Sequence, residues 1–415
     1  MPFNQRIQSE LVARVNAGLD RKLTVLEGGN QSTFTLRQPS SAEYTPDSTE
    51  YTHGSTEHKT GSDKYNDNLN RVEKRYVNFS SNDYLGLASS SELAQAWQQG
   101  IDKYGVGSGA SPLVTGFSPA HQALEDTLCD WLGYSRAVVF SSGFSANQAV
   151  LFSLLQKDDL LLQDKLNHAS LLEAGKLSPA QMRRFKHNDI EQLRHLLLSR
   201  KPPLVVTEGV FSMDGDQAPL NQINQVVNQS NAWLMVDDAH GIGVLGKNGA
   251  GSCQLAGIKP QFLVVTFGKA FGLSGAAVLC NASTGDYLTQ FARHHVYSTA
   301  LPPSQAHALN HAATMLRTQQ WRRDKLAELY HAYDKGLNGL AGFVATNTPI
   351  KPFICGDVER TCRLANQLKA SGNWVTAIRP PTVAKQTSRI RITLTANHTV
   401  QQVNHLTHSI NMLTN

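Results

Sequence analysis

Residues 264–272 read VVTFGKAFG, and they set one lysine, Lys269, between two glycines directly after an apolar run. The run over residues 262–267 is typical of a buried strand. A lysine at the end of such a strand is partly withdrawn from water, which lowers its pKa and frees its amine to form a Schiff base. The glycines leave room for a flat ring. A lone lysine in a glycine-rich turn is more often an exposed loop residue, so the interpretation depends on two further segments.

The first of these segments, residues 233–241, reads WLMVDDAHG. A short apolar strand here runs directly into two carboxylates and a histidine, and strand ends are where α/β folds place their chemistry. A buried aspartate needs a cationic partner, because a lone buried carboxylate is costly to keep charged. The protonated ring nitrogen of pyridoxal phosphate is one such partner for Asp237.

The second segment, residues 137–144, reads AVVFSSGF. It predicts a strand, then a turn of small residues, and then a helix that continues over residues 146–155. Free backbone N–H groups at the start of that helix would hold a phosphate group.

Together these segments resemble the α-oxoamine synthases, a family of fold-type-I pyridoxal-phosphate enzymes. The resemblance rests on the phosphate turn, the Asp-x-x-His pattern from Asp237 and the Thr-Phe-Gly-Lys pattern that ends at Lys269. It extends over residues 1–36 and 75–415. The resemblance implies an α/β fold like that of aspartate aminotransferase. In this fold a mostly parallel central sheet carries helices on both faces, and a smaller α+β domain forms the C-terminal part.

The pattern of strands agrees with that fold class. Apolar runs predict strands over residues 137–140, 160–163, 204–207, 233–237, 262–267 and 275–280. Helical segments separate most of these runs, and such alternation predicts a parallel-rich sheet covered on both faces. Near the C-terminus, residues 389–395 read RIRITLT and begin with alternating arginine and isoleucine, which predicts a half-exposed strand.

Three domains are expected: an N-terminal segment over residues 1–84, a large cofactor-binding domain over 85–315 and a small C-terminal domain over 316–415. Apolar residues spaced by four, Ile7, Leu11, Val15 and Leu19, predict a helix near the N-terminus. Residues 40–70 are polar and contain more acidic than basic side chains. Such a segment cannot bury enough apolar area to offset its ordering entropy, so we expect a mobile insertion.

Composition excludes several classes of function. The 415 residues include 38 Lys and Arg against 33 Asp and Glu, a net charge of +5 without a long basic run, so nucleic acid is not an expected partner. The five cysteines are scattered and form no Cys-x-x-Cys pair, which predicts neither disulfides nor a zinc site. Neither a secretory signal nor an apolar run of about 18 residues is present, so we expect a cytoplasmic protein without membrane or metal.

The resemblance also implies roles for residues around a pyridoxal 5'-phosphate cofactor. Lys269 would hold the cofactor and act as the base, and Asp237 would pair with the ring nitrogen. His168 would stack on one face of the ring, and Ala239 would lie against the other face. His240 would contact the phenolic oxygen, and it counts with these residues as catalytic. The other implied cofactor contacts are Ser212 on the phenolic oxygen, Gly143, Phe144 and Thr266 around the phosphate, and Thr299 on the phosphate of the neighbouring subunit in a homodimer with shared active sites.

For the substrates, the resemblance implies that Arg379 forms a bidentate contact with an amino-acid carboxylate. Thr382 and Arg21 would lie near an acyl substrate, and Asn82 and His168 are further expected substrate contacts. The implied branch of the family performs a decarboxylative Claisen condensation of L-alanine with a pimeloyl thioester of CoA or acyl-carrier protein. The products would be 8-amino-7-oxononanoate, carbon dioxide and free thiol, in biotin biosynthesis.

Alternatives stay open within and outside this branch. A serine palmitoyltransferase-like or a 2-amino-3-ketobutyrate CoA ligase-like enzyme would share most of the site. A pyridoxal-phosphate aminotransferase would keep Lys269 and Asp237 but would have no use for a thioester channel.

Overall fold

The computed structural model describes residues 1–21, 23–26, 31–39, 71–198 and 203–414. The expected mobile insertion at residues 40–70 lies outside this described part. The chain forms two compact units: Met1–Gly29 with Phe34–Tyr76, and Asn30–Thr33 with Val77–Asn415. The predicted boundaries after residues 84 and 315 stay predictions.

The first unit contains helix α1 (Phe3–Asn16) and most of strands β1 (Thr33–Pro39) and β2 (Arg71–Asn78). The predicted N-terminal helix is present, but it ends before Leu19. None of its residues is buried within the described chain, although Ile7, Leu11 and Val15 share one face.

The second unit is built around a sheet of seven strands in the order β3-β9-β8-β7-β6-β4-β5. The strands are β3 (Arg136–Phe140), β4 (Leu160–Asp164), β5 (Gln181–Phe185), β6 (Pro203–Glu208), β7 (Trp233–Asp237), β8 (Phe262–Thr266) and β9 (Ala276–Cys280). Neighbouring strands from β5 to β8 run parallel, and β9 runs antiparallel to both β8 and β3. The predicted mostly parallel sheet is therefore confirmed.

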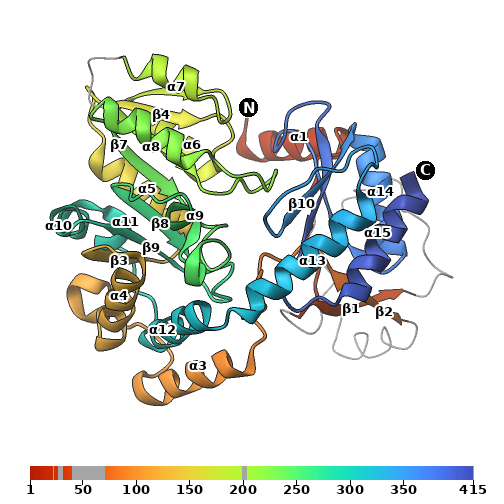
Figure 1. Cartoon of the computed structure of the whole chain (residues 1–415), viewed down its shortest axis with the longest axis horizontal. Coiled ribbons are helices and arrows are strands. Elements are labelled where there is room, and N and C mark those ends of the chain that lie inside the picture. Colours follow the sequence, from red (N-terminus) through yellow and green to blue (C-terminus); the bar gives the residue numbers. More distant parts are fainter. Residues whose placement is uncertain (22, 27–30, 40–70, 199–202, 415) are drawn as a thin grey trace. The chain divides into compact units, whose positions relative to one another are not determined.

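Both faces of this sheet are apolar, as parallel strands covered by helices require. In β8, Leu263 and Val265 belong to one hydrophobic cluster, and Phe262 and Val264 belong to a second cluster on the opposite face. Helices α4 (Pro119–Leu132), α8 (Leu220–Gln229) and α12 (Pro303–Thr318) contribute to the first cluster. Helices α5 (Gly143–Leu154), α6 (Ala169–Leu177) and α10 (Ala282–Phe291) contribute to the second, so helices cover both faces (Figure 1).

The helices around this sheet are α3 (Ser91–Tyr104), α4 (Pro119–Leu132), α5 (Gly143–Leu154), α6 (Ala169–Leu177), α7 (Ile190–Leu196), α8 (Leu220–Gln229), α9 (Gly251–Leu255), α10 (Ala282–Phe291), α11 (Arg293–Val296) and α12 (Pro303–Thr318). A π-helical turn covers Pro112–Gly116 and a 3-10 turn covers Lys247–Gly249. No helix in the described part of the chain is long and apolar enough to cross a membrane.

The C-terminal part contains α13 (Trp321–Leu337), α14 (Val358–Ala370) and α15 (Val400–Thr414) beside a small antiparallel sheet. That sheet has the order β10 (Ile350–Gly356), β13 (Ser388–Thr393) and β12 (Thr376–Ile378). The short strand β11 (Asn373–Trp374) pairs in parallel with Val77 and Asn78 of β2.

The prediction that the strand near residue 389 is half exposed is wrong. Every residue of β13 is buried, and Arg389 and Arg391 are only 6% and 7% exposed. Both guanidinium groups have polar partners on the loop after β6. Arg389 pairs with Asp214, and Nε of Arg391 donates to the carbonyl oxygen of Ser212 at 2.7 Å. Hydrogen bonding allows these charged side chains to be buried.

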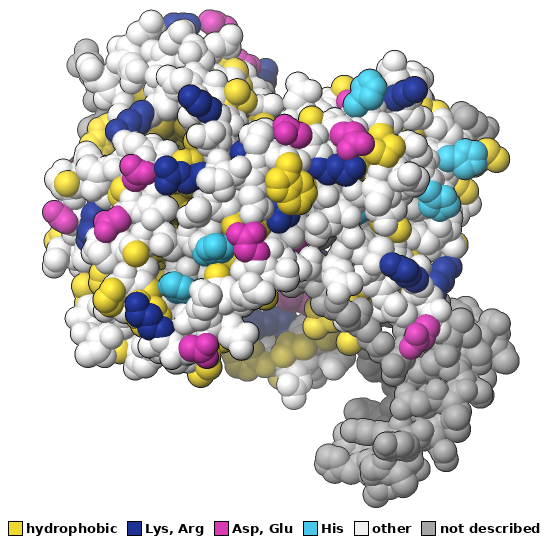
Figure 2. Space-filling model, turned by 60° about the horizontal axis from the view of Figure 1, so that its bottom comes forward, with side chains coloured by type: hydrophobic (Ala, Val, Ile, Leu, Met, Phe, Trp, Pro, Cys, Tyr) yellow, Lys and Arg dark blue, Asp and Glu magenta, His cyan; other side chains and the backbone are white. Residues whose placement is uncertain are grey.

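On the molecular face shown in Figure 2, basic and acidic side chains are interspersed. Neither sign of charge forms a continuous patch on this face.

Candidate active site

The carboxyl ends of the parallel strands position most of the predicted site residues. Strand β7 ends at Asp237, and β8 ends at Thr266 just before the turn that carries Lys269. The end of β4 leads through a short turn to His168 at the start of α6. Because parallel strands end along one edge of the sheet, these side chains come together there.

The turn that presents Lys269 depends on Gly272. Its φ of +71° is a conformation that L side chains rarely adopt, and a Cβ there would lie 2.4 Å from the backbone nitrogen of Ala88. Its N–H donates to the carbonyl oxygen of Lys269 at 2.9 Å. Glycine at this position therefore allows the tight turn that places Lys269 just after the end of β8.

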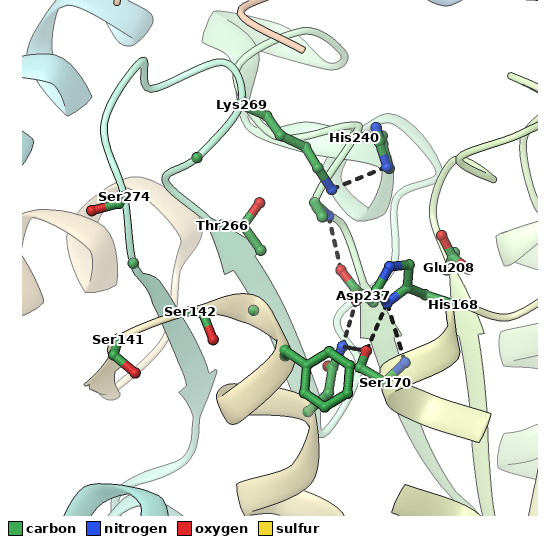
Figure 3. A pocket seen from close by; sticks show the side chains of 16 residues that line it. Ser141, Ser142, His168, Ser170, Glu208, Asp237, His240, Thr266, Lys269 and Ser274 are labelled. Atoms are coloured by element: carbon green, nitrogen blue, oxygen red, sulfur yellow. Dashed lines mark hydrogen bonds between the residues drawn. The ribbon is translucent and has the colours of Figure 1, made fainter. Parts of the chain in front are cut away.

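A cavity of about 320 Å³ opens at this edge of the sheet (Figure 3). Its lining brings together eight residues predicted from the sequence: Gly143, Phe144, His168, Asp237, Ala239, His240, Thr266 and Lys269. The other lining residues are Ser141, Ser142, Asn147, Ser170, Glu208, Gly268, Ser274 and Gly275.

Lys269 and His240 are in direct contact at one wall of the cavity. Nζ of Lys269 lies 3.0 Å from Nε2 of His240, and Nδ1 of the same ring lies 2.7 Å from the Tyr84 hydroxyl oxygen. Burial lowers the pKa of Lys269 to about 8, although the charge of Asp237 opposes this. Burial and the nearby lysine both hold the pKa of His240 well below its usual range. The imidazole is therefore neutral near pH 7.

Asp237 is fixed by two donors. Nδ2 of Asn147 donates to it at 2.7 Å, and the backbone N–H of Ala239 donates at 3.0 Å. These donors hold the carboxylate in one orientation at the cavity. Asn147 also donates to the Ser170 hydroxyl oxygen at 3.0 Å, and that oxygen lies 2.8 Å from Nδ1 of His168. One chain of hydrogen bonds thus orients both Asp237 and His168 (Figure 3).

The opposite end of the cavity suits a phosphate group. Helix α5 starts at Gly143, where a Cβ would lie 2.5 Å from Cγ2 of Thr266, so only glycine fits without a shift of Thr266. The first N–H groups of a helix lack partners within the helix and attract anions. The hydroxyl oxygen of Thr266 is buried without a hydrogen-bond partner among the described residues. The donors here therefore fit a phosphate oxygen.

Two further predicted residues lie behind the cavity wall. Nη2 of Arg391 donates to Oδ1 of Asn82 at 3.0 Å, and the Tyr84 hydroxyl group donates to the same oxygen at 3.2 Å. The carbonyl oxygen of Ser212 accepts from Arg391. Neither Asn82 nor Ser212 lines the cavity itself.

Four predicted residues lie elsewhere. Thr299 lines a separate, smaller cavity, which shares only Ser141 with the first one. Arg379 is half-buried after β12, and exposed Thr382 donates its N–H to the carbonyl oxygen of Arg379 at 3.1 Å. Neither lines the described cavity. Arg21 belongs to the first unit and is exposed.

Several residues with prominent places in the site had no predicted role. Asn147 and Ser170 are buried polar residues of α5 and α6, and the sequence does not set them apart from the other polar residues of these helices. Glu208 ends β6 as Asp237 ends β7, so its position could have been recognised from strand periodicity. Tyr84 gave no separate signal, because its contact with His240 joins distant parts of the sequence.

Comparison with known proteins identifies the family. The model for aminotransferase class I and II matches residues 74–410. An 8-amino-7-oxononanoate synthase from Vibrio atlanticus is 59% identical over 408 residues, which cover 98% of this chain and 93% of that relative. The chain belongs to the 8-amino-7-oxononanoate synthase family. The membership confirms the resemblance to the α-oxoamine synthases inferred from the phosphate turn, the Asp-x-x-His pattern and Lys269.

Solved structures resemble this synthase chain over most of its length. A serine palmitoyltransferase from Sphingomonas wittichii matches with a TM-score of 0.77 and 29% identity, covering 82% of this chain and 88% of that chain. An 8-amino-7-oxononanoate synthase from Francisella tularensis matches with a TM-score of 0.71 and 31% identity, covering 81% and 98%. The predicted fold class, that of the fold-type-I enzymes, is confirmed.

Proposed function

We propose that this synthase binds pyridoxal 5'-phosphate in the cavity around Lys269 and condenses L-alanine with a pimeloyl thioester. The products are 8-amino-7-oxononanoate, carbon dioxide and the free thiol of CoA or acyl-carrier protein. The observation that supports this most directly is the pairing of a half-buried lysine of lowered pKa with a neutral histidine, in the same cavity as a carboxylate fixed by two donors.

The cavity residues fit the proposed cofactor in their polar chemistry. Asp237 offers an anion to a protonated ring nitrogen. His168 and Ala239 also line the cavity, and we propose that they contact the two faces of the ring. The start of α5 and the unpartnered Thr266 hydroxyl group offer donors to the phosphate. When bound, pyridoxal phosphate supplies an electron sink for the bonds at the amino-acid Cα.

Lys269 carries two roles in this proposal. Its amine would anchor the cofactor, and the same amine would be the base that takes the proton from Cα of alanine. A pKa of about 8 makes a useful fraction of the amine neutral at physiological pH, which a base requires. His240 holds the amine at 3.0 Å and stays neutral, so it does not repel a protonated lysine.

The substrate contacts form a second part of the proposal. Arg379 binds the carboxylate of alanine through a planar guanidinium, which also orients the bond that is lost with carbon dioxide. Thr382 and Arg21 would lie near the acyl substrate, and Asn82 and His168 would be further substrate contacts. We further propose a cytoplasmic homodimer with shared active sites, in which Thr299 reaches the phosphate bound by the other subunit.

A substrate panel tests the proposed reaction. Purified protein with pyridoxal phosphate is incubated with alanine, serine or glycine and with pimeloyl-, palmitoyl- or acetyl-CoA, and free thiol and product mass are measured. We expect thiol release with alanine and pimeloyl-CoA, together with the mass of 8-amino-7-oxononanoate. Preference for serine with palmitoyl-CoA, or for glycine with acetyl-CoA, would move the chain to another branch of the α-oxoamine synthases. Amino transfer to a keto acid without thiol release would contradict the condensation altogether.

A further inference from the structure

The cavity contains a second carboxyl group that the proposed reaction leaves without a role. Glu208 is the last residue of β6, and its Cα pairs in register with that of Asp237 on β7. Paired residues on neighbouring strands point to the same face, so the two carboxyl groups lie side by side at the cavity. Glu208 lines the cavity yet is only 2% exposed.

The two carboxyl groups have different hydrogen-bond environments. Asp237 accepts from Asn147 and from the backbone N–H of Ala239. Glu208 receives the backbone N–H of His168, but its Oε1 is buried without any partner among the described residues. A buried carboxylate oxygen without a donor is costly, whereas a protonated carboxyl group there can itself donate to an acceptor in the cavity.

The electrostatic surroundings of Glu208 also favour its neutral form. Burial holds the pKa of Glu208 well above its usual range, and the neighbouring charge of Asp237 raises it further. Asp164 acts in the same sense, whereas Lys269 and the N–H of His168 oppose it. Two carboxyl groups whose surroundings favour different protonation states often carry different roles in a site.

We propose that Glu208 is a neutral carboxylic acid that donates a hydrogen bond to the phenolic oxygen of the bound cofactor. The inference rests on the proposed function, because pyridoxal phosphate is the ligand it assumes. That molecule has its phosphate at the donor-rich start of α5 and its ring nitrogen at Asp237. The phenolic oxygen is the other acceptor attached directly to the ring, on the carbon two bonds from the ring nitrogen and on the side away from the phosphate arm. It is therefore the acceptor available to a donor beside Asp237.

The test compares Glu208→Gln with Glu208→Leu. Glutamine is neutral and keeps a donor, whereas leucine is neutral, of similar size and has none. Each protein is loaded with pyridoxal phosphate, and the absorbance of the bound cofactor is titrated with pH. The midpoint reports the proton that the cofactor shares with Nζ of Lys269. The dissociation constant of the cofactor is measured in parallel.

If Glu208 is neutral and donates to the cofactor, only Glu208→Leu changes the midpoint. In Glu208→Gln the midpoint stays within about 0.3 pH unit of wild type. In Glu208→Leu it rises by about one unit, because a donor to the phenolic oxygen favours loss of the shared proton, and cofactor affinity falls about tenfold.

Other outcomes overturn the assignment. A charged Glu208 would stabilise the protonated form of the bound cofactor, so both variants would lower the midpoint. An unchanged midpoint in both variants would mean that Glu208 does not contact the cofactor. Failure of the wild-type protein to bind pyridoxal phosphate would instead refute the proposed function.

Two controls guard against indirect effects. Glu125→Gln alters another buried glutamate, 4% exposed, that does not line this cavity, and it should leave the midpoint unchanged. Thermal unfolding checks that each variant is folded. If Glu208→Leu does not fold, infrared difference spectroscopy of Glu208→Gln against wild type still decides the protonation state. A protonated carboxyl band lost in the variant supports the proposal, and a lost carboxylate band overturns it.

Discussion

Nζ of Lys269 lies 3.0 Å from Nε2 of His240, within hydrogen-bond distance in a buried site. Two cationic groups at this distance would repel each other strongly, because burial reduces the screening of charge. The lowered pKa values of both groups remove that conflict near neutral pH. Because the His240 ring stays neutral, the contact positions the lysine amine without charge repulsion whether or not the amine carries a proton.

Replacing Lys269 by alanine should leave a folded protein without turnover. The lysine anchors the proposed cofactor and acts as base, so neither role survives its loss. Borohydride should fix pyridoxal phosphate to wild-type protein but not to Lys269→Ala, as mass spectrometry of the intact chain can show. Lys259→Ala, which removes an exposed lysine, is the matched control and should behave as wild type. Covalent labelling of Lys269→Ala would mean that another lysine is the anchor.

Tyr84→Phe should slow the reaction more than it destabilises the fold. The change removes the hydroxyl group 2.7 Å from Nδ1 of His240 and leaves a buried ring nitrogen without that partner. We expect kcat to fall about tenfold and the free energy of unfolding to fall by about 1–2 kcal/mol.

Tyr134→Phe is the control for Tyr84→Phe. It deletes a buried hydroxyl group that donates to the carbonyl oxygen of Pro260 at 3.1 Å, away from the cavity. Tyr134→Phe should lower the free energy of unfolding by a similar amount and leave kcat unchanged. Equal loss of kcat in the two variants would show that Tyr84 acts through stability alone.

His187 should stabilise the fold in a pH-dependent way. Its two ring nitrogens lie 3.0 Å from Asp164 and 2.7 Å from Asp216. Burial alone would lower the pKa of His187, but the hydrogen bonds and charges of the two carboxylates outweigh it and raise the pKa to about 10. Because the unfolded chain has a histidine pKa of about 6.5, this contribution is complete below that pH. It is then lost as pH rises toward 10.

The variant His187→Ala measures this contribution. At pH 6 it should lower the free energy of unfolding by about 3 kcal/mol, and the difference from wild type should shrink between pH 6.5 and 10. His311→Ala breaks an exposed pair with Glu92 at 3.0 Å and should cost at most about 1 kcal/mol. If the difference in free energy of unfolding between His187→Ala and wild type stays constant over this pH range, His187 does not act as a charged partner of Asp164 and Asp216.

Arg379→Ala should weaken alanine binding by about 30- to 1000-fold, the value of a charge-assisted bidentate contact. Arg379→Lys should recover part of the binding but little of the rate, because a point charge does not set the plane of a carboxylate. Alanine titrations followed by the absorbance of the bound cofactor give the dissociation constants. Cofactor content should match wild type in both variants, and an alanine affinity within about twofold of wild type would remove Arg379 from the site.

Six of the seven strands of the large sheet could be predicted from their apolar runs. The exception is β5, which reads QMRRF and buries only Phe185 fully. It lies at the edge of the sheet, where one side meets solvent and polar residues are accepted. Periodicity therefore identified the buried strands and missed the exposed one.

The site was predictable where one residue type at a strand end determines the chemistry, as for Lys269 and Asp237. It was not predictable where the partner is distant in sequence. The burial of Arg391 depends on Ser212 and Asn82, which belong to other segments of the chain. Alternating polar and apolar residues along one strand show that its two faces differ. They do not show which polar groups elsewhere in the chain contact a charged side chain on that strand.

The antiparallel strand β9 has a consequence for biosynthesis. Strand β3 pairs only with β9 in the sheet, so Phe140 has no ladder partner until Ala276 has been synthesised. At about 5–20 residues per second, the ribosome needs on the order of ten seconds to reach that point. Throughout this interval the nascent chain carries an unpaired apolar strand directly before Gly143. A chain that stops before β9 therefore leaves this strand open to aggregation and the start of α5 without its anchor.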